Sequence, residues 1–405
     1  MKLVHTSDWH IGAWLGAIDR RPDLEAAIDG LVDLVAEVRP DLILHTGDLF
    51  DRSLPGGDDM RFAADALSRL AAVAPVLVLC GNHDGRQTFA ALNTFASIGG
   101  DRLRLLAQID IRQPVLSWPT ANGGRLRIGA VPYQPLAAAG FAALAEGTVS
   151  GGAYADRIRQ LWALIGAAFE RDRGPGDVDV AAAHLHVSGA VLARSEKAVH
   201  VGDDAATDPS ALPAVSYAGY GHIHKPQALP GAAAGRYAGS IIQIDFGEAG
   251  EQKGAVVVDA APGRAARIEP VVLASGRPLV SVTRALADLP ELLAGHPGSI
   301  LRISVTDPDR VEQLADRVAD LLPEGSSCHS VVQPSLARPA ATATAAGADP
   351  EASVLTLLSE YATTVHGRAE VVTALTELWS EALADPDADL TDGAVAELTH
   401  TLEAG

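Results

Sequence analysis

The chain carries near its start the stretch LVHTSDWH, residues 3–10, which joins an apolar run to two side chains that can bind metal. The run from Leu3 to Thr6 has the length of a buried strand, and Asp8 and His10 follow it directly. Beyond this stretch, short apolar runs alternate with helical patterns through the first half of the chain. The alternation predicts an α/β layered core, in which ligands lie in the loops after the carboxyl ends of strands.

The expected elements of this core are short strands and amphipathic helices. In the first helix, apolar side chains recur on one face between Leu24 and Val38, and Pro40 ends the helix. We expect further strands at residues 42–45, 76–80, 125–131, 178–184, 216–220 and 255–259, and helices at 60–72, 88–98 and 154–171. The catalytic core is therefore expected to cover residues 1–270.

The rest of the chain is expected to form smaller parts. Residues 271–337 carry a β-α-β-α pattern, with strands at 279–283 and 300–305 and helices at 286–293 and 311–322, which predicts a small α+β second domain. Residues 338–352 are rich in Ala, Thr, Gly and Pro, as in a flexible linker. Residues 353–405 return to helical patterning, but helices this short cannot form a substantial core alone and should dock onto a partner.

Charge and cysteine content limit the class of protein. The 405 residues carry a net charge of −20, which repels polyanions, so nucleic acid would have to be met through a local positive patch, metal ions or a partner. The cysteines Cys80 and Cys328 are far apart and lack metal-ligand spacing, which indicates a reducing compartment. The first residues run straight into a motif without a signal-peptide pattern, and no stretch is a continuous transmembrane-length apolar run. We therefore expect a cytoplasmic protein.

Five short motifs follow expected strands and together offer carboxylate, imidazole and carboxamide ligands. The ligand candidates are Asp8, His10, Asp48, Asn82, His184, His222 and His224. Each motif alone has little specificity, but all five in order, with glycine before Asp48, Asn82 and His222, predict a metallophosphoesterase. The mixed ligand set suits Mn²⁺, with Fe²⁺ or Zn²⁺ as alternatives. Asp48 is the natural bridge between two ions that would support an in-line phosphoryl displacement.

The other histidines receive different predictions. His83 follows Asn82 directly, projects differently and could act as general acid, the alternative being a packed loop histidine. His5 and His45 lie in apolar strands and are expected to support the site or pack in the core. His184 is preferred over His186, which would be the ligand if the strand ended later. Surface positions are expected for His200, His296, His329, His366 and His400.

The motifs resemble those of the SbcD nuclease subunits of bacterial SbcCD complexes, within the calcineurin-like superfamily. The resemblance rests on residues 5–12, 47–51, 81–84, 184–185, 221–224, 237–240 and 246–248. It implies a metallophosphoesterase β-sandwich flanked by helices. It also implies one metal held by Asp8, His10, Asp48 and His224, a second held by Asp48, Asn82, His184 and His222, and His83 as the catalytic acid. Archaeal and eukaryotic relatives carry a second histidine at the position of Asp51. Bacterial members resemble this chain there, and the role of Asp51 stays open.

The same resemblance implies an activity and partners. It points to a Mn²⁺-dependent exonuclease on double-stranded DNA ends and an endonuclease on single strands and hairpins, acting in DNA repair and recombination. Residues 271–337 would be the capping domain, and the C-terminal helices would grip the coiled-coil base of an SMC-like ATPase, SbcC. Helices at 60–70 and 88–98 would form a homodimer within a heterotetramer, the alternative being that they simply face the core.

Two other functions are compatible with part of the pattern. A metallophosphoesterase acting on a small phosphodiester or a phosphoprotein would share the metal site, but would not need the second domain and the tethered helices. A non-enzymatic scaffold would retain only the fold, yet degenerate members normally lose ligands and here every expected ligand is present.

Overall fold

The structure, a computed structural model, describes residues 1–120, 123–135, 153–193, 206–232, 234–273 and 276–334. The predicted linker at 338–352, the predicted helices at 353–405, and His200, His366 and His400 lie outside these residues. Among the described helices, none is long and apolar enough to cross a membrane.

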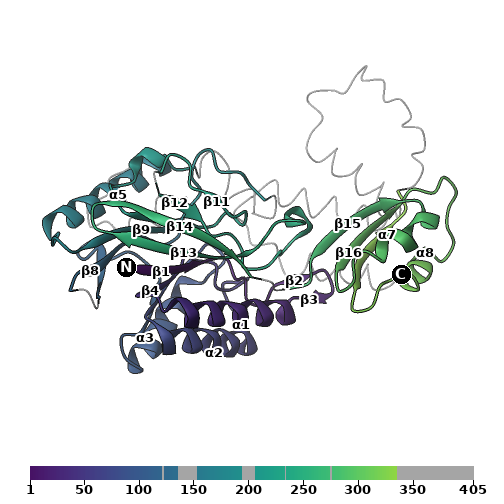
Figure 1. Cartoon of the computed structure of the whole chain (residues 1–405), viewed down its shortest axis with the longest axis horizontal. Coiled ribbons are helices and arrows are strands. Elements are labelled where there is room, and N and C mark those ends of the chain that lie inside the picture. The colour runs from purple at the N-terminus through teal and green to yellow at the C-terminus, as the bar shows by residue number, and fades with distance from the viewer. Residues whose placement is uncertain (121–122, 136–152, 194–205, 233, 274–275, 335–405) are drawn as a thin grey trace, which may run out of the picture. The chain divides into compact units, whose positions relative to one another are not determined.

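Two six-stranded sheets form the centre of the fold (Figure 1). The first has the order β14-β13-β1-β4-β5-β6 and the second the order β11-β12-β10-β9-β8-β7. The first sheet contains β1 (Lys2–Thr6), β4 (Leu42–His45), β5 (Val76–Leu79), β6 (Leu103–Leu106), β13 (Gly254–Ala261) and β14 (Arg264–Val272). The second contains β7 (Val115–Pro119), β8 (Arg125–Val131), β9 (Val178–His184), β10 (Tyr217–Gly221), β11 (Gln227–Ala228) and β12 (Gly235–Tyr237). In each sheet four adjacent strands run parallel, so their carboxyl ends share one edge.

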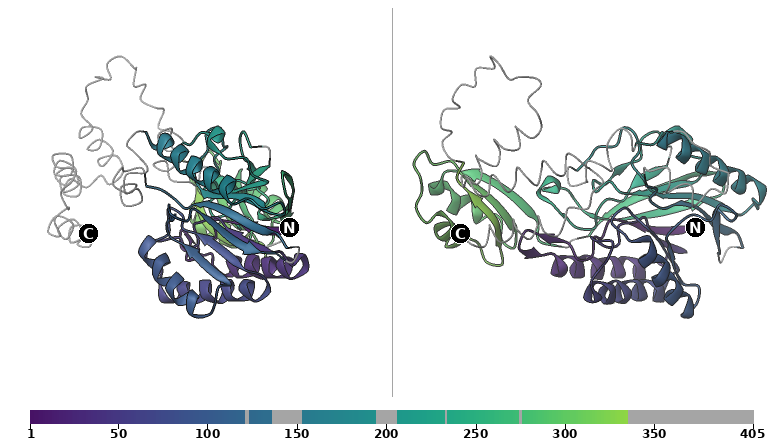
Figure 2. Two further views of the ribbon diagram at one scale, coloured as in Figure 1. Left: turned by 90° about the vertical axis from the view of Figure 1, so that its left-hand side faces the viewer. Right: turned by 180° about the vertical axis from the view of Figure 1, so that it is seen from behind.

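The sheets pack face to face, and helices cover their outer faces (Figure 2). Leucines of β1, β4 and β5 meet aliphatic side chains of β8 and β9 in the inter-sheet core. The helices α1 (Arg21–Val38), α2 (Gly57–Val73) and α3 (Arg86–Ile98) bury their apolar faces with the first sheet, and α5 (Tyr154–Arg171) does so with the second. Strands such as β4 are covered on both faces in this arrangement. This explains why their sequences are continuous apolar runs. The predicted α/β layered sandwich is confirmed.

A third, smaller sheet follows the sandwich in sequence. It contains β15 (Leu279–Arg284), β16 (Ile300–Val305) and β17 (Ser327–Val332), all parallel, with α7 (Leu289–Leu293) and α8 (Leu314–Ala319) between them. A hydrophobic cluster of its own joins this sheet to the two helices. The β-α-β-α pattern therefore continues into one more strand, β17, than the sequence predicts.

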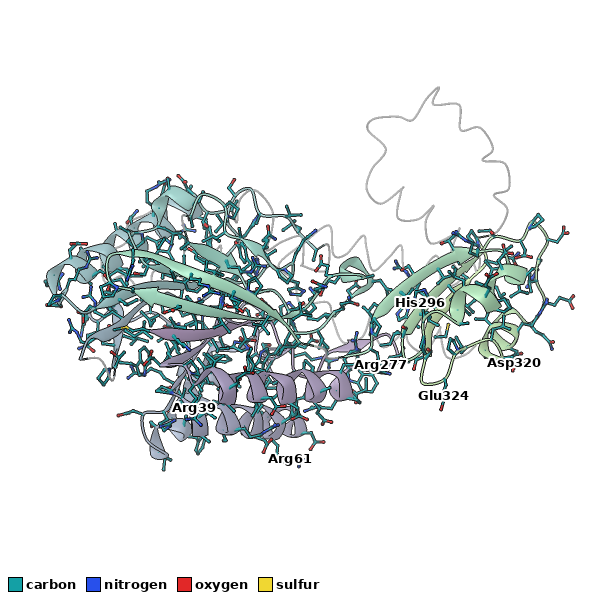
Figure 3. The ribbon with its side chains drawn as sticks, viewed as in Figure 1. Arg39, Arg61, Arg277, His296, Asp320 and Glu324 are labelled. Atoms are coloured by element: carbon teal, nitrogen blue, oxygen red, sulfur yellow. The ribbon has the colours of Figure 1, made fainter. Side chains whose placement is uncertain are left out.

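Polar and aromatic contacts connect this sheet to the sandwich. Arg277, labelled in Figure 3, lies just before β15 and pairs with Asp23 of α1, with 2.8 Å between Nη2 and Oδ2. Phe246 has the guanidinium of Arg302 over its ring and the ring of His329 at 5.1 Å. The prediction of His329 as a surface residue was wrong, because its half-buried ring packs on Phe246.

Candidate metal centre

The predicted ligands follow the carboxyl ends of five strands, three from the first sheet and two from the second. Asp8 and His10 follow β1, Asp48 follows β4 and Asn82 follows β5; His184 ends β9, and His222 and His224 follow β10. Hydrogen bonds join the loops of the two sheets; for example, His222 N–H donates to Asp8 Oδ1 at 3.1 Å, and His184 Nδ1 donates to the Thr46 carbonyl at 2.7 Å. The sandwich therefore brings residues far apart in the sequence to one edge.

The backbone at this edge is strained. Asp8, His10, Asp48 and His222 have φ angles of 51°, 48°, 53° and 93°, in the left-handed region that non-glycine residues rarely adopt. Such conformations cost about 1–3 kcal/mol each and persist only where the surroundings enforce them, typically at functional sites. Gly47 beside them has no room for a side chain, since a Cβ there would lie 2.2 Å from His184 Nδ1.

Four of the candidates form one tight group. Asp8, His10, Asp48 and His224 are buried, and each offers a ligand atom within 4.8 Å of the others. His10 Nε2 lies 3.1 Å from His224 Nε2 and 3.6 Å from Asp48 Oδ2. Asp8 and Asp48 form no ion pair with a lysine or arginine among the described residues, so a bound cation is the fitting counter-charge for these buried carboxylates.

The remaining candidates gather around the side chain of Asn82. Its Oδ1 lies 2.9 Å from His184 Nε2 and 2.7 Å from His222 Nδ1. Asp48 Oδ2 lies 3.4 Å from His184 Nε2 as well as near His10, so this carboxylate touches both groups. All seven predicted ligands therefore belong to two groups that share Asp48, and their oxygen and nitrogen atoms fit divalent ions of the Mn²⁺, Fe²⁺ or Zn²⁺ type.

Similarity to known proteins agrees with this geometry. Residues 1–226 match the family model described as calcineurin-like phosphoesterase. The chain belongs to this family. It is 30% identical over 286 residues to the D subunit of nuclease SbcCD of Bacillus subtilis (strain 168), covering 69% of this chain and 71% of that protein. It is 29% identical over 326 residues to the corresponding SbcCD nuclease component of Rhodobacter capsulatus, covering 77% and 78% respectively.

These relatives confirm the resemblance to SbcD nucleases. As a calcineurin-like phosphoesterase, the chain is a hydrolase of phosphate esters, in a family that uses divalent metal ions.

Glu248 holds one imidazole of this phosphoesterase site in place and was not recognised as a site residue from the sequence. It is fully buried, and its Oε1 accepts from His224 Nδ1 at 2.9 Å, which directs Nε2 toward the group of Asp8 and Asp48. Its Oε2 lies 2.8 Å from both Ser240 Oγ and Lys253 Nζ. Burial raises the pKa of Glu248, but pairing with His224 and Lys253 lowers it well below its usual range. The carboxylate therefore stays charged and fixes the histidine tautomer.

Replacing Glu248 by glutamine should weaken metal binding by about 10- to 100-fold, because the charge that orients His224 and raises its basicity is lost. Isothermal titration calorimetry of the metal-free protein with Mn²⁺ measures the change in affinity. Glu269→Gln is the matched control, since Glu269 is a 60% exposed glutamate on β14. Equal affinities in both variants would show that Glu248 serves only the packing.

Asp51 and Asp84 also support the site. Asp51 Oδ1 lies 3.3 Å from His10 Nδ1, so the open role of Asp51 is best explained as orienting His10. Burial raises the pKa of Asp51, but the neighbouring imidazole of His10 brings it below its ordinary value. Asp84 accepts from the backbone N–H groups of Phe50 and Gly81, at 2.9 and 2.8 Å, and so ties the Asp48 loop to the Asn82 loop.

His83 lies beside the site in a defined orientation. Its backbone N–H donates to Asp48 Oδ1 at 2.8 Å, and its ring Nδ1 donates to the Asp51 carbonyl at 2.9 Å. Its ring centroid is 4.6 Å from that of His10. His10, Asp51 and His83 also offer ligand atoms within 4.8 Å of one another, a second grouping that the sequence did not predict.

Three histidines that the sequence analysis placed outside the ligand set, His5, His45 and His186, have partners other than the candidate ligands. The buried His5 contacts Tyr217 Oη and Thr46 Oγ1 at 2.8 and 2.9 Å, and His45 Nδ1 accepts from Gly47 N–H at 3.3 Å. The backbone carbonyl of His186 accepts from Thr207, and His186 is in neither cluster of potential metal-binding side chains among the described residues.

The buried histidines should make the metal-free protein sensitive to acid. Burial lowers the pKa of both His5 and His45 from 6.5 to about 3, with smaller contributions from the neighbouring charges of Arg236 and His184 respectively. Between these values the unfolded chain binds protons that the folded chain does not, so stability falls as pH falls, by about 1.4 kcal/mol per pH unit for each histidine. Denaturant unfolding between pH 7 and 4 measures this slope. His5→Gln should reduce it and His296→Gln should not; an unchanged slope in His5→Gln would contradict the assignment.

Proposed function

We propose that the chain is a Mn²⁺-dependent DNA nuclease subunit that acts with an SMC-like ATPase in DNA repair and recombination. The position of Asp48 between two ligand groups carries the proposal, because two ions sharing a carboxylate are the arrangement used for in-line displacement at phosphorus. The names of the two SbcCD nuclease relatives favour nucleic acid as the substrate. The proposed reactions are exonuclease cleavage at double-stranded ends and endonuclease cleavage of single strands and hairpins.

In this proposal the two ligand groups hold two ions. One would bind Asp8, His10, Asp48 and His224, and the other Asp48, Asn82, His184 and His222. When bound, the ions would activate a water and neutralise charge on the phosphate. The buried partners Glu248 and Thr46, together with the partly exposed Asp51, contact three of the imidazoles and would hold them in place before the ions bind.

His83 is assigned the role of general acid. Its Nδ1–H is held by the Asp51 carbonyl, so proton transfer to the leaving oxygen is assigned to Nε2. Its backbone contact with Asp48 keeps the ring close to both ligand groups. The contact with Asp48 is made by the main chain, so the side chain can change without removing it.

The segments outside the core are assigned to substrate handling and assembly. We assign residues 1–270 to the catalytic domain, residues 271–337 to a capping domain, residues 338–352 to a linker, and residues 353–405 to docking on the ATPase. Exposed apolar side chains on and beside α2 and α3 support the proposed homodimer surface: Leu54, Phe95 and Ile98 are 83%, 71% and 81% exposed.

The deciding experiment compares substrates on the purified chain. With Mn²⁺, blunt and hairpin DNA should be cleaved, and a chelator should abolish the cleavage. Bis-p-nitrophenyl phosphate serves as the generic phosphodiester. Cleavage of that ester with intact DNA, even when the ATPase is added, would favour the alternative of a small phosphodiester or phosphoprotein substrate. A chain truncated before residue 353 should cleave the ester normally but fail to bind the ATPase.

A further inference from the structure

A pocket of about 430 Å³ lies next to the residues that flank His224, and no step of the proposed reaction uses it. Its lining comes from β12, β13, β14 and the segments before β11 and β13. The charged side chains in this lining are Lys225, Arg236, Glu251 and Lys253. We call it the Arg236 pocket. It shares a wall with the metal centre, since Lys225 follows His224 directly and Lys253 Nζ donates to the His224 carbonyl at 2.8 Å.

Arg236 is an uncompensated cation in this pocket. Its Nε is buried and has no hydrogen-bond partner, and no carboxylate lies within ion-pair distance of it among the described residues. Its charge contributes to the lowered pKa of the buried His5, so the guanidinium reaches into the sandwich. Burial in turn lowers the pKa of Arg236 itself. A half-buried guanidinium without an acceptor is costly unless a ligand provides one.

The carboxylates near the pocket are already used by lysines. Glu251 Oε2 lies 2.8 Å from Lys253 Nζ, and its Oε1 lies 4.0 Å from Lys225 Nζ. Glu248 also pairs with Lys253 at 2.8 Å. Two glutamates thus face three cations, Lys225, Arg236 and Lys253, which leaves one positive charge in a chain whose net charge is −20.

We propose that the Arg236 pocket binds a phosphate group, with Arg236 as its main ligand and Lys225 at its rim. A guanidinium presents a planar fork of donors that matches phosphate oxygens, and Lys225 adds a mobile point charge. The volume suits a nucleotide-sized ligand. The choice of phosphate over other anions rests on the proposed nuclease function, which would supply two sources: the backbone of the nucleic acid or a released nucleotide.

The test uses metal-free protein in chelator, so that binding at the metal centre does not contribute and the result does not depend on cleavage. The probes are inorganic phosphate, deoxyadenosine monophosphate, and a single-stranded thymidine oligonucleotide without a terminal phosphate, at constant ionic strength. Calorimetry should detect binding by the wild type that Arg236→Met weakens by about 10- to 100-fold. Arg264→Met is the control, because Arg264 is exposed at the start of β14 and outside the pocket.

Thermal unfolding provides a second measurement. Without ligand, Arg236→Met should melt at or above the wild-type temperature, since it removes an uncompensated charge, and phosphate should raise the melting temperature of the wild type only. If that variant fails to fold, Lys225→Gln carries the test, because Lys225 is 43% exposed and its replacement should weaken binding several-fold without affecting folding.

The outcomes separate the two sources of phosphate. If phosphate and the mononucleotide bind, and this binding depends on Arg236, the ligand is a released nucleotide. If only the oligonucleotide binds, the ligand is the backbone of the nucleic acid. The proposal is overturned if the wild type binds none of the probes, or if neither Arg236→Met nor Lys225→Gln weakens binding. If the chain binds phosphate through Arg236 but cleaves no DNA, the proposal for the pocket stands and the proposed nuclease function is wrong.

Discussion

Replacing His83 by glutamine should lower the rate of phosphodiester cleavage by about 10²- to 10⁴-fold, the usual contribution of a positioned general acid. Bound metal should stay, because the contact of His83 with Asp48 is made by the backbone N–H. The loss should be much smaller for bis-p-nitrophenyl phosphate than for DNA, since p-nitrophenolate leaves without protonation. Steady-state rates on both substrates, with metal content measured alongside, test this expectation.

The matched control for His83 is His296→Gln, a histidine of the third-sheet region that lies in neither ligand group (Figure 3). It should leave both rates unchanged. If His83→Gln instead loses bound metal, then the grouping of His83 with His10 and Asp51 is a binding site, and the general-acid assignment is wrong.

Replacing Asp48 by asparagine should remove both ions and reduce cleavage to background. The carboxylate lies 3.6 Å from His10 Nε2 and 3.4 Å from His184 Nε2, so both groups lose the only charged ligand they share. Asparagine keeps the shape and can still accept from the backbone of His83, which separates the loss of charge from a loss of fold. Equilibrium dialysis with metal analysis gives the number of ions bound per chain.

Asn82→Ala is the informative comparison for Asp48. The Asn82 carboxamide oxygen contacts His184 and His222, which both belong to the second ligand group, so this variant should lose one ion and keep the other. Retention of two ions by Asp48→Asn, or loss of both by Asn82→Ala, would contradict a bridging role for Asp48.

The elements that the sequence predicted well are those with one clear burial pattern. In α1, the side chains of Leu24, Ile28, Leu31 and Val35 are buried as predicted, and β4, β8, β9, β16 and α5 have the predicted bounds. Strands with mixed patterns were missed: β14 is an edge strand that tolerates Pro270, and β17 is half-buried along most of its length. The helix predicted at 311–322 begins only at Leu314, because Gln313 adopts a left-handed conformation with φ 50°.

In the candidate site, too, some residues could be predicted from the sequence and others could not. The seven candidate ligands could be named from the sequence because Asp, Asn and His after apolar runs are conspicuous, and the structure places them at the ends of β-strands. Their orienting partners were not found. A backbone carbonyl such as that of Thr46 has no sequence signature, and Glu248 lies 24 residues from His224, in a turn whose approach depends on tertiary packing. The strained φ angles of Asp8, His10 and Asp48 are likewise set by the fold and not by residue type.

The order in which the ligands occur along the chain has a consequence during protein synthesis. Asp8 and His222 are 214 positions apart yet joined by a hydrogen bond, and β13, which pairs with β1, lies later still at Gly254–Ala261. A growing chain on the ribosome therefore has no complete centre until it has been made beyond His224 and the second sheet has closed on the first. We therefore expect a growing chain to hydrolyse nothing until both sheets have been made and packed together.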